Sequence, residues 1–139
     1  MEIEGIGIEE LLPQQPPFMM VDQLTKYESG EAETIFTVRE DNVMLQNGTL
    51  SAAGLMENIA QTSAARIGYY YKYVLHEPVK VGFIGAVKNL KVMRNPAIGE
   101  TVRTTIHVIA EAFGMVAFVA VIADAEGKAI ARGEMKTAI

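Results

Sequence analysis

The stretch from Asn47 to Val74 constrains the fold of this chain more than any other. It opens with Asn47-Gly48, a pair typical of a tight turn, and continues as a mostly apolar segment whose apolar residues recur at helical spacing. Thr49 or Ser51 can cap the first N–H groups of such a helix. Up to Val74 it would contain about 24 residues and measure about 36 Å, enough to cross a whole sheet. We therefore expect one long helix at the centre of the fold.

Glu57, in the second turn, is the only carboxylate in this stretch. It falls at the border of the apolar arc, beside Gln61, whereas Asn58, Thr62 and Arg66 mark the opposite side. From periodicity alone, an acid at such a border is most simply a surface residue. The arc fills about half of the helix circumference and comprises Leu55, Met56, Ile59, Ala60, Ala64, Ile67, Tyr70, Tyr71 and Val74.

The rest of the chain is typical of β-strands. Segments rich in β-branched and aromatic residues are separated by short turn sequences such as Glu28-Ser29-Gly30. A single helical turn from Ile8 to Leu12 precedes them, and His76-Glu77-Pro78 ends the long helix. The predicted strands are Phe18–Leu24, Glu33–Arg39, Lys80–Met93, Thr101–Ala110, Met115–Ala123 and Lys128–Ala138.

Two of these strands carry clear face patterns. Between Thr101 and Ala110, apolar residues and threonines alternate with Arg103 and His107, which indicates one buried face. The segment Met115–Ala123 is apolar on both faces, so we expect a central strand that is covered on both sides. Short connections favour antiparallel neighbours. The prediction is a single α+β domain over residues 1–139, with a curved antiparallel sheet of about six strands around one helix.

Composition narrows the function. The net charge is −5 and the basic residues are scattered, which argues against nucleic acid as a partner. The chain has no cysteine, and its two histidines belong to no cluster with metal-ligand spacing, so we expect neither a thiolate nucleophile nor a metal site. The acidic, glycine-interrupted start is unlike a signal peptide, and no apolar run is long enough to span a bilayer. A cytoplasmic protein is the expectation.

Four motifs, in order, resemble the hotdog-fold 3-hydroxyacyl-ACP dehydratases of bacteria. LLPQQPPFMMVD is similar to the family's LLP-His-Arg-x-PF-x-x-VD segment, although Gln14 and Gln15 replace His-Arg. GLMENIAQTSA resembles its helix, in which an acid precedes an Ala-Gln pair by three residues. GFIGAVKNLKVMRNPAIGE and GKAIARGEMKTA look like a later strand with its turn and the closing strand. Together the motifs cover nearly the whole chain and imply a hotdog fold.

The resemblance also implies a catalytic role for Glu57. These dehydratases combine the helix acid of one subunit with a His, in a Gly-His-Phe-Pro loop, of the other. Glu57 falls on the acid, but the His would fall near Val43, where NVMLQNGTLS contains neither His nor Pro. The loop and helix start look more like a divergent subgroup, some members of which occur in pigment-type polyene gene clusters. Glu57 would then serve as both acid and base, or His107 or His76 would replace the missing partner.

Dehydration of a 3-hydroxyacyl thioester requires a base, an acid and donors to the enolate-like oxygen. Backbone N–H groups near Ala52 and Ala53, helped by the helix dipole, are the expected donors. Gln61 is expected to hold the acid or to pack the helix. Asn47 and Gly48 are most simply a turn, with a substrate-binding role as the alternative.

The implied substrate is an acyl thioester carried by the phosphopantetheine of an acyl carrier protein or of CoA, and no cofactor is implied. The implied assembly is a homodimer or larger oligomer, or a heterodimer with another hotdog protein. Two rival functions stay open: a thioesterase in which Glu57 activates water, and a non-catalytic subunit that pairs with an active dehydratase or binds acyl chains. The cations expected at the surface, a subset of which could meet a phosphate or an acidic carrier, are Arg66, Lys72, Lys88, Lys91 and Arg94.

Overall fold

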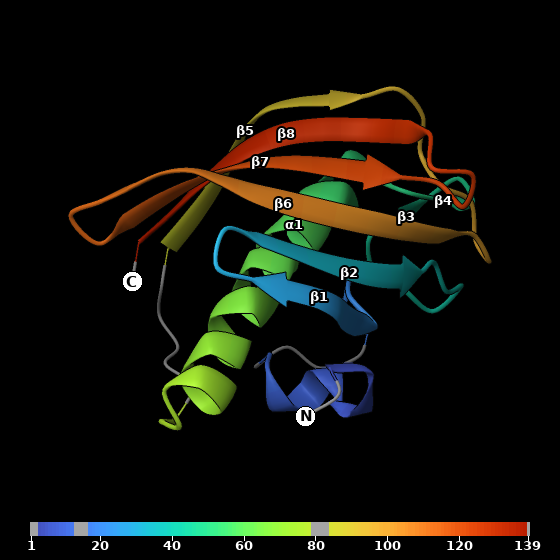
Figure 1. The fold of residues 1–139 in the computed structure, drawn as a ribbon. Coiled ribbons are helices and arrows are strands. Elements are labelled where there is room, and N and C mark those ends of the chain that lie inside the picture. Colours follow the sequence, from blue (N-terminus) through green and yellow to red (C-terminus); the bar gives the residue numbers. More distant parts are fainter. Residues whose placement is uncertain (1–2, 13–16, 79–83, 139) are drawn as a thin grey trace.

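Figure 1 shows the computed structural model, which describes residues 3–12, 17–78 and 84–138. One long helix crosses one face of a six-stranded antiparallel sheet, whose strand order is β1-β2-β6-β7-β8-β5. This architecture is the one that the sequence predicts. The strands are β1 (Gln23–Glu28), β2 (Glu31–Thr37), β5 (Ile84–Val92), β6 (Thr101–Ala112), β7 (Met115–Ala123) and β8 (Ala129–Ala138).

The long helix α1 (Ala52–Tyr69) begins at a capping serine. The Oγ of Ser51 accepts a hydrogen bond from the Gly54 N–H at 3.2 Å, which satisfies one of the free donors of the first turn. A π-helical segment, η3 (Tyr70–Val74), continues α1 at its C-terminal end. The predicted helix to Val74 is therefore confirmed, with Ser51 as its cap.

The core lies between α1 and the inner face of the sheet. Leu55 and Ile59 of the helix are fully buried there. In β6 the predicted alternation is confirmed, because Val102 and Ile106 are buried whereas Arg103 and His107 are exposed. Two short 3-10 helices, η1 (Ile3–Gly5) and η2 (Ile8–Glu10), precede the sheet.

The predicted strand Phe18–Leu24 is wrong over most of its length, since β1 begins only at Gln23. The preceding residues Met19, Met20 and Val21 are all buried, without the alternation of a strand. The N–H and carbonyl of Met20 pair with side chains of α1 instead of with a neighbouring strand, as the site below describes. The two-residue connection Ser29-Gly30 between β1 and β2 agrees with the predicted hairpin turn.

Strand β7 lies inside the sheet between β6 and β8, as predicted. Its inner side chains, including Phe118 and Ile122, are fully buried, but the outer side chains of Val119 and Val121 are only half-buried. The expected cover on both faces is therefore wrong for the described chain, in which α1 covers one face. β5 is described from Ile84, and the first residues of the predicted strand, 80–83, lie outside the described residues.

A small hairpin links the sheet to the helix. Its strands are β3 (Leu45–Gln46) and β4 (Thr49–Leu50), joined by Asn47 and Gly48. Both turn residues have positive φ, 54° and 78°, as a two-residue type I′ turn requires. The Gly48 carbonyl accepts a hydrogen bond from Ile98 N at 3.1 Å, which ties the turn to the loop before β6. No helix of the described residues is long and apolar enough to span a membrane.

Candidate functional site at the start of the long helix

Glu57 projects from the second turn of α1 and is half-buried. Its Oε1 accepts a hydrogen bond from Gln61 Nε2 at 3.0 Å, one helical turn further on. Among the described residues, this is the only hydrogen bond of the Glu57 side chain, so Oε2 has no protein donor there. The carboxylate is thus held in place through one oxygen while the other is left available.

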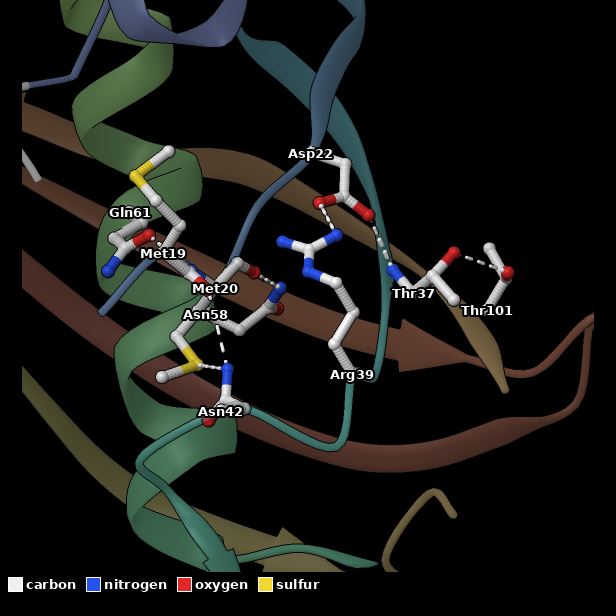
Figure 2. A network of polar contacts seen from close by, with 9 residues as sticks. All are labelled: Met19, Met20, Asp22, Thr37, Arg39, Asn42, Asn58, Gln61 and Thr101. Carbon is white, nitrogen blue, oxygen red and sulfur yellow. Dashed lines mark hydrogen bonds and ion pairs between the residues drawn. The ribbon is translucent and has the colours of Figure 1, made fainter. Parts of the chain in front are cut away.

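Gln61 is itself fixed by the segment that precedes β1. Its Nε2 also donates to the Phe18 carbonyl at 2.9 Å, and its Oε1 accepts from Met20 N at 2.7 Å. Figure 2 shows Gln61 beside Met19 and Met20. Because the amide nitrogen meets two acceptors and the amide oxygen meets an N–H, the orientation of the Gln61 amide is determined. Glu57 is therefore hydrogen-bonded to a buried side chain whose amide nitrogen and oxygen both have further partners.

Asn58 fixes the same segment from the next position on the helix. Its Nδ2 donates to the Met20 carbonyl at 2.6 Å (Figure 2). Its Oδ1 accepts from Thr104 Oγ1 at 2.5 Å. The next turn continues this polar line, because Thr62 Oγ1 donates to the Asn58 carbonyl and lies 2.8 Å from Thr34 Oγ1. These buried contacts join α1 to β2 and β6.

The position of these polar residues corrects the sequence interpretation. Asn58 and Thr62 were expected on the side opposite the apolar arc, yet both are fully buried against the sheet. Part of the expected apolar arc is exposed instead, since 38 % of Met56 is accessible. The signal that points to this arrangement is the pair of inward threonines, Thr34 and Thr104, in strands that are otherwise apolar inside.

The loop between β2 and β3 is tied to the same segment. Asn42 Nδ2 lies 3.4 Å from the Met19 carbonyl and 3.2 Å from Met20 Sδ, and its Oδ1 accepts from Met44 N at 2.8 Å. Nearby, Asp22 accepts hydrogen bonds from Thr37 N at 2.7 Å and from Arg39 Nη1 at 2.8 Å (Figure 2). The segment before β1, which contacts Gln61 beside Glu57, is thereby held by α1, by the β2–β3 loop and by the end of β2.

The helix start next to Glu57 is open. Ala52 and Ala53 are exposed, and their N–H groups, the first two of the helix, have no acceptor among the described residues. Such groups carry the positive end of the helix dipole and suit an oxygen that gains negative charge. The structure thus places a half-buried carboxylate and two free backbone donors within the first two turns of one helix.

A family model described as ApeP dehydratase matches residues 6–138. The chain belongs to the ApeP-like family. Comparison with curated protein sequences gave no match. The motif-based assignment to hotdog dehydratase-like proteins is confirmed.

Solved structures agree with this ApeP-like hotdog fold. The dehydratase heterocomplex ApeI:P from Xenorhabdus doucetiae matches with a TM-score of 0.84 at 16% identity, over 96% of this chain and 90% of that chain. The E. coli PaaI protein of the phenylacetic acid degradation operon matches with a TM-score of 0.65 at 15% identity, over 84% and 81%. A hypothetical thioesterase with coenzyme A from Streptococcus pneumoniae TIGR4 matches with a TM-score of 0.63 at 10% identity, over 84% and 83%.

Neither histidine of this ApeP-like chain lies beside Glu57. His107 is exposed on the outer face of β6, where its Nε2 lies 3.6 Å from Glu31 Oε1. His76 follows η3 and is exposed, with a positive φ of 56°. It is 19 residues beyond Glu57, or roughly 28 Å at the rise of a helix. A histidine partner for Glu57 is thus missing from the described part of this chain.

The remaining predicted site residues, Asn47 and Gly48, lie in a turn. Asn47 and Gly48 form the tip of the β3–β4 hairpin, and no described hydrogen bond joins them to Glu57. Within the described residues, no three His, Asp or Glu side chains are grouped so that they could hold a metal ion. Where the dehydratases that this chain resembles have their histidine loop, this chain has the short β3–β4 hairpin directly before α1.

Proposed function

We propose that this protein binds 3-hydroxyacyl thioesters and catalyses their dehydration with Glu57 as the acid and base. The observation that carries this proposal is the Glu57 carboxylate, held through one oxygen by Gln61 at the open start of α1 in an ApeP-like chain. The thioester would be carried by the phosphopantetheine of an acyl carrier protein or of CoA.

In the proposed reaction the thioester loses water across its α and β carbons. The free Oε2 of Glu57 takes the α-proton, and the electron pair moves toward the thioester carbonyl. The N–H groups of Ala52 and Ala53 stabilise the oxygen that becomes negative. As the β-carbon–oxygen bond breaks, the protonated Glu57 returns its proton to the leaving hydroxyl. The products are an enoyl thioester and water, and the carboxylate is restored.

The remote histidines support a second candidate. A dehydratase of this type that lacks a histidine at its own site would be completed by a partner subunit that supplies one. A solved structure that this chain resembles is described as a dehydratase heterocomplex. In this second candidate the chain pairs with another hotdog protein and contributes Glu57, or only its fold, to a shared site.

The test is an assay of the purified protein, alone and mixed with a hotdog dehydratase that retains the family's histidine loop. The substrates are 3-hydroxyacyl and enoyl thioesters of CoA and of a carrier protein, and products are followed by mass spectrometry. Dehydration by the protein alone supports the first candidate, and dehydration that depends on the mixture supports the second. Free acid and thiol as the products would instead identify a thioesterase.

The matched variants are Glu57→Gln and Glu126→Gln. Glu126 is an exposed acid in the turn between β7 and β8, so its substitution is expected to leave the rate unchanged. Glu57→Gln is expected to lower kcat by at least about 100-fold, the usual contribution of a positioned acid or base. Equal rates for the Glu57 variant and the wild type would show that Glu57 is not catalytic.

A further inference from the structure

A cleft lies along the C-terminal half of α1, separate from the Glu57 site. It has a volume of about 280 Å³. Arg66, which lines it, follows Glu57 by nine residues, which on a helix corresponds to about half a circumference and roughly 14 Å along the axis. The cleft is bounded by α1, the β1–β2 turn and the β6–β7 hairpin, whose far end extends beyond that turn in Figure 1. Its lining residues are Tyr27, Ser29, Arg66, Ile67, Tyr70, Glu111 and Val116.

Arg66 is a cation without an acid. Its Nη2 donates to the Ser29 carbonyl at 2.6 Å, and its guanidinium lies 5.7 Å from the centre of the Phe118 ring. Its Nε is buried and has no hydrogen-bond partner. No carboxylate among the described residues lies within ion-pair distance of Arg66. A half-buried guanidinium with an unpaired donor and no ion pair among the described residues is suited to an anionic ligand.

Three of the other four arginines have a carboxylate partner, and the fourth, Arg132, is exposed and forms no ion pair among the described residues. Arg39 pairs with Asp22, Arg103 pairs with Glu33 at 2.8 Å, and Arg94 pairs with both Glu100 and Asp124. The side chains of these three paired arginines, Arg39, Arg94 and Arg103, are about half exposed, and each has a carboxylate partner. The isolation of Arg66 is therefore a feature of its cleft and not a shortage of acids in a chain of net charge −5.

The other walls of the cleft suit a compact apolar or aromatic body. Ile67 and Val116 are buried apolar residues, and Tyr27 and Tyr70 add aromatic surface. Tyr27 is held by Tyr69, whose ring centre lies 4.5 Å from its own. The Tyr27 hydroxyl, a group with an ordinary pKa of about 10, is protonated at neutral pH and can donate a hydrogen bond, and burial raises this pKa further.

We propose that this cleft binds a small organic carboxylate, with the carboxylate on Arg66 and an apolar or aromatic body between the tyrosines and Val116. A single cation with apolar walls matches a monocarboxylate. Phosphate is usually bound by several cations or by converging backbone N–H groups, which the cleft lining does not provide. The opposite wall carries one exposed acid, Glu111, which repels an anionic ligand.

The test measures binding to the whole protein by isothermal titration, with 3-phenylpropionate and hexanoate as carboxylate probes. 3-Phenylpropionamide is the neutral control with the same body, and inorganic phosphate is the anion without a body. At least one carboxylate is expected to bind saturably at one site, with the amide and phosphate at least tenfold weaker. Absence of saturable carboxylate binding, or equal binding of the amide or of phosphate, overturns the proposal.

Three variants locate the site. Arg66→Gln is expected to weaken carboxylate binding at least tenfold, whereas Arg103→Gln, which removes an arginine on the outer face of the sheet, is expected to change it less than twofold. Glu111→Lys is expected to strengthen binding severalfold, because it replaces a repulsive charge with an attractive one at an exposed position. This third variant does not depend on the packing of Arg66 against Phe118. Unchanged affinity in a folded Arg66→Gln or in Glu111→Lys contradicts the assignment.

Discussion

The two halves of α1 differ in how their charged residues are matched. In the N-terminal half, Glu57 is bonded by Gln61, and Gln61 in turn holds the backbone of Phe18 and Met20. In the C-terminal half, Arg66 has a carbonyl and an aromatic ring as neighbours but no acid. The comparison shows that one helix carries two groups of opposite charge on opposite faces.

The difference also concerns what each half is packed against. The N-terminal half is fixed by side chain–backbone hydrogen bonds to a segment about 40 residues earlier in the chain. The C-terminal half is packed by rings and close contact: Tyr69 stacks on Tyr73 with ring centres 5.3 Å apart, and Gly68 lies against the carbonyl oxygen of Leu11. We expect substitutions in the two halves to separate activity, stability and ligand binding.

The largest expected effect distinguishes the two charges. Glu57→Gln should lower the rate of thioester turnover at least about 100-fold, while carboxylate binding at the Arg66 cleft stays within twofold of the wild type. Arg66→Gln should show the reverse. Turnover assays and titrations on the same two purified variants make the measurement. If both variants lose both properties, the two sites are one, and the comparison between the halves of α1 fails.

The next effect tests the close packing of the C-terminal half. A Cβ added at Gly68 would clash with the Leu11 carbonyl oxygen, which is backbone and cannot rotate away. Gly68→Ala is therefore expected to lower the free energy of unfolding by about 3 kcal/mol. Gly30→Ala is the control, because no atom lies within 4 Å of its added Cβ. Urea unfolding of the two variants gives the comparison, and equal stabilities would contradict the packing described.

The hydrogen bonds of Gln61 should contribute somewhat less to the free energy of unfolding than the close packing at Gly68. Gln61→Leu removes two donated hydrogen bonds and one accepted bond, and leaves the Phe18 carbonyl and the Met20 N–H without partners. We expect a loss of about 2 kcal/mol in the free energy of unfolding. Gln46→Leu, at an exposed glutamine in β3, should change stability by less than about 0.5 kcal/mol. A Gln61 variant as stable as the Gln46 variant would show that the segment before β1 is held in another way.

The smallest effect concerns pH and the end of the helix. The hydrogen bonds from Lys72 and Tyr73 lower the pKa of Glu10, and the bond to Glu10 raises the pKa of Lys72. A lowered acid pKa stabilises the fold above the unfolded value of about 4, and this contribution is lost as pH falls through the folded pKa. A raised lysine pKa stabilises the fold below about 10, and this contribution is lost at higher pH.

The Glu10 contact should therefore contribute between about pH 4 and pH 10. The melting temperature of Glu10→Gln is expected to lie slightly below that of the wild type at pH 7, and the two should converge near pH 3. Thermal melts at both pH values make the test, and a constant difference across this range would contradict the ion pair. Because all these groups are near the surface, the difference should also shrink in high salt.

Local pattern in the sequence was sufficient for the long helix and for most of the strands. The helical period of the stretch after Asn47-Gly48, the alternation in β6 and the turn at Ser29-Gly30 all depend on neighbours a few residues apart. Glu57 was identified through a motif resemblance, because periodicity alone marks it only as a residue at the border of an apolar arc. These features needed no knowledge of which distant segments meet.

Only the tertiary structure decided the rest. The residues before β1 have strand-like composition, yet their backbone partners are the side chains of Asn58 and Gln61, which no local pattern connects to them. Burial of Asn58 and Thr62 became possible because inward threonines of β2 and β6 satisfy them. The isolation of Arg66 is likewise a property of three elements that meet around it. Hydrophobic periodicity and turn sequences depend on residues a few positions apart. Hydrogen bonds between buried polar groups join segments that are far apart in the sequence, and they position the residues of both candidate sites on α1.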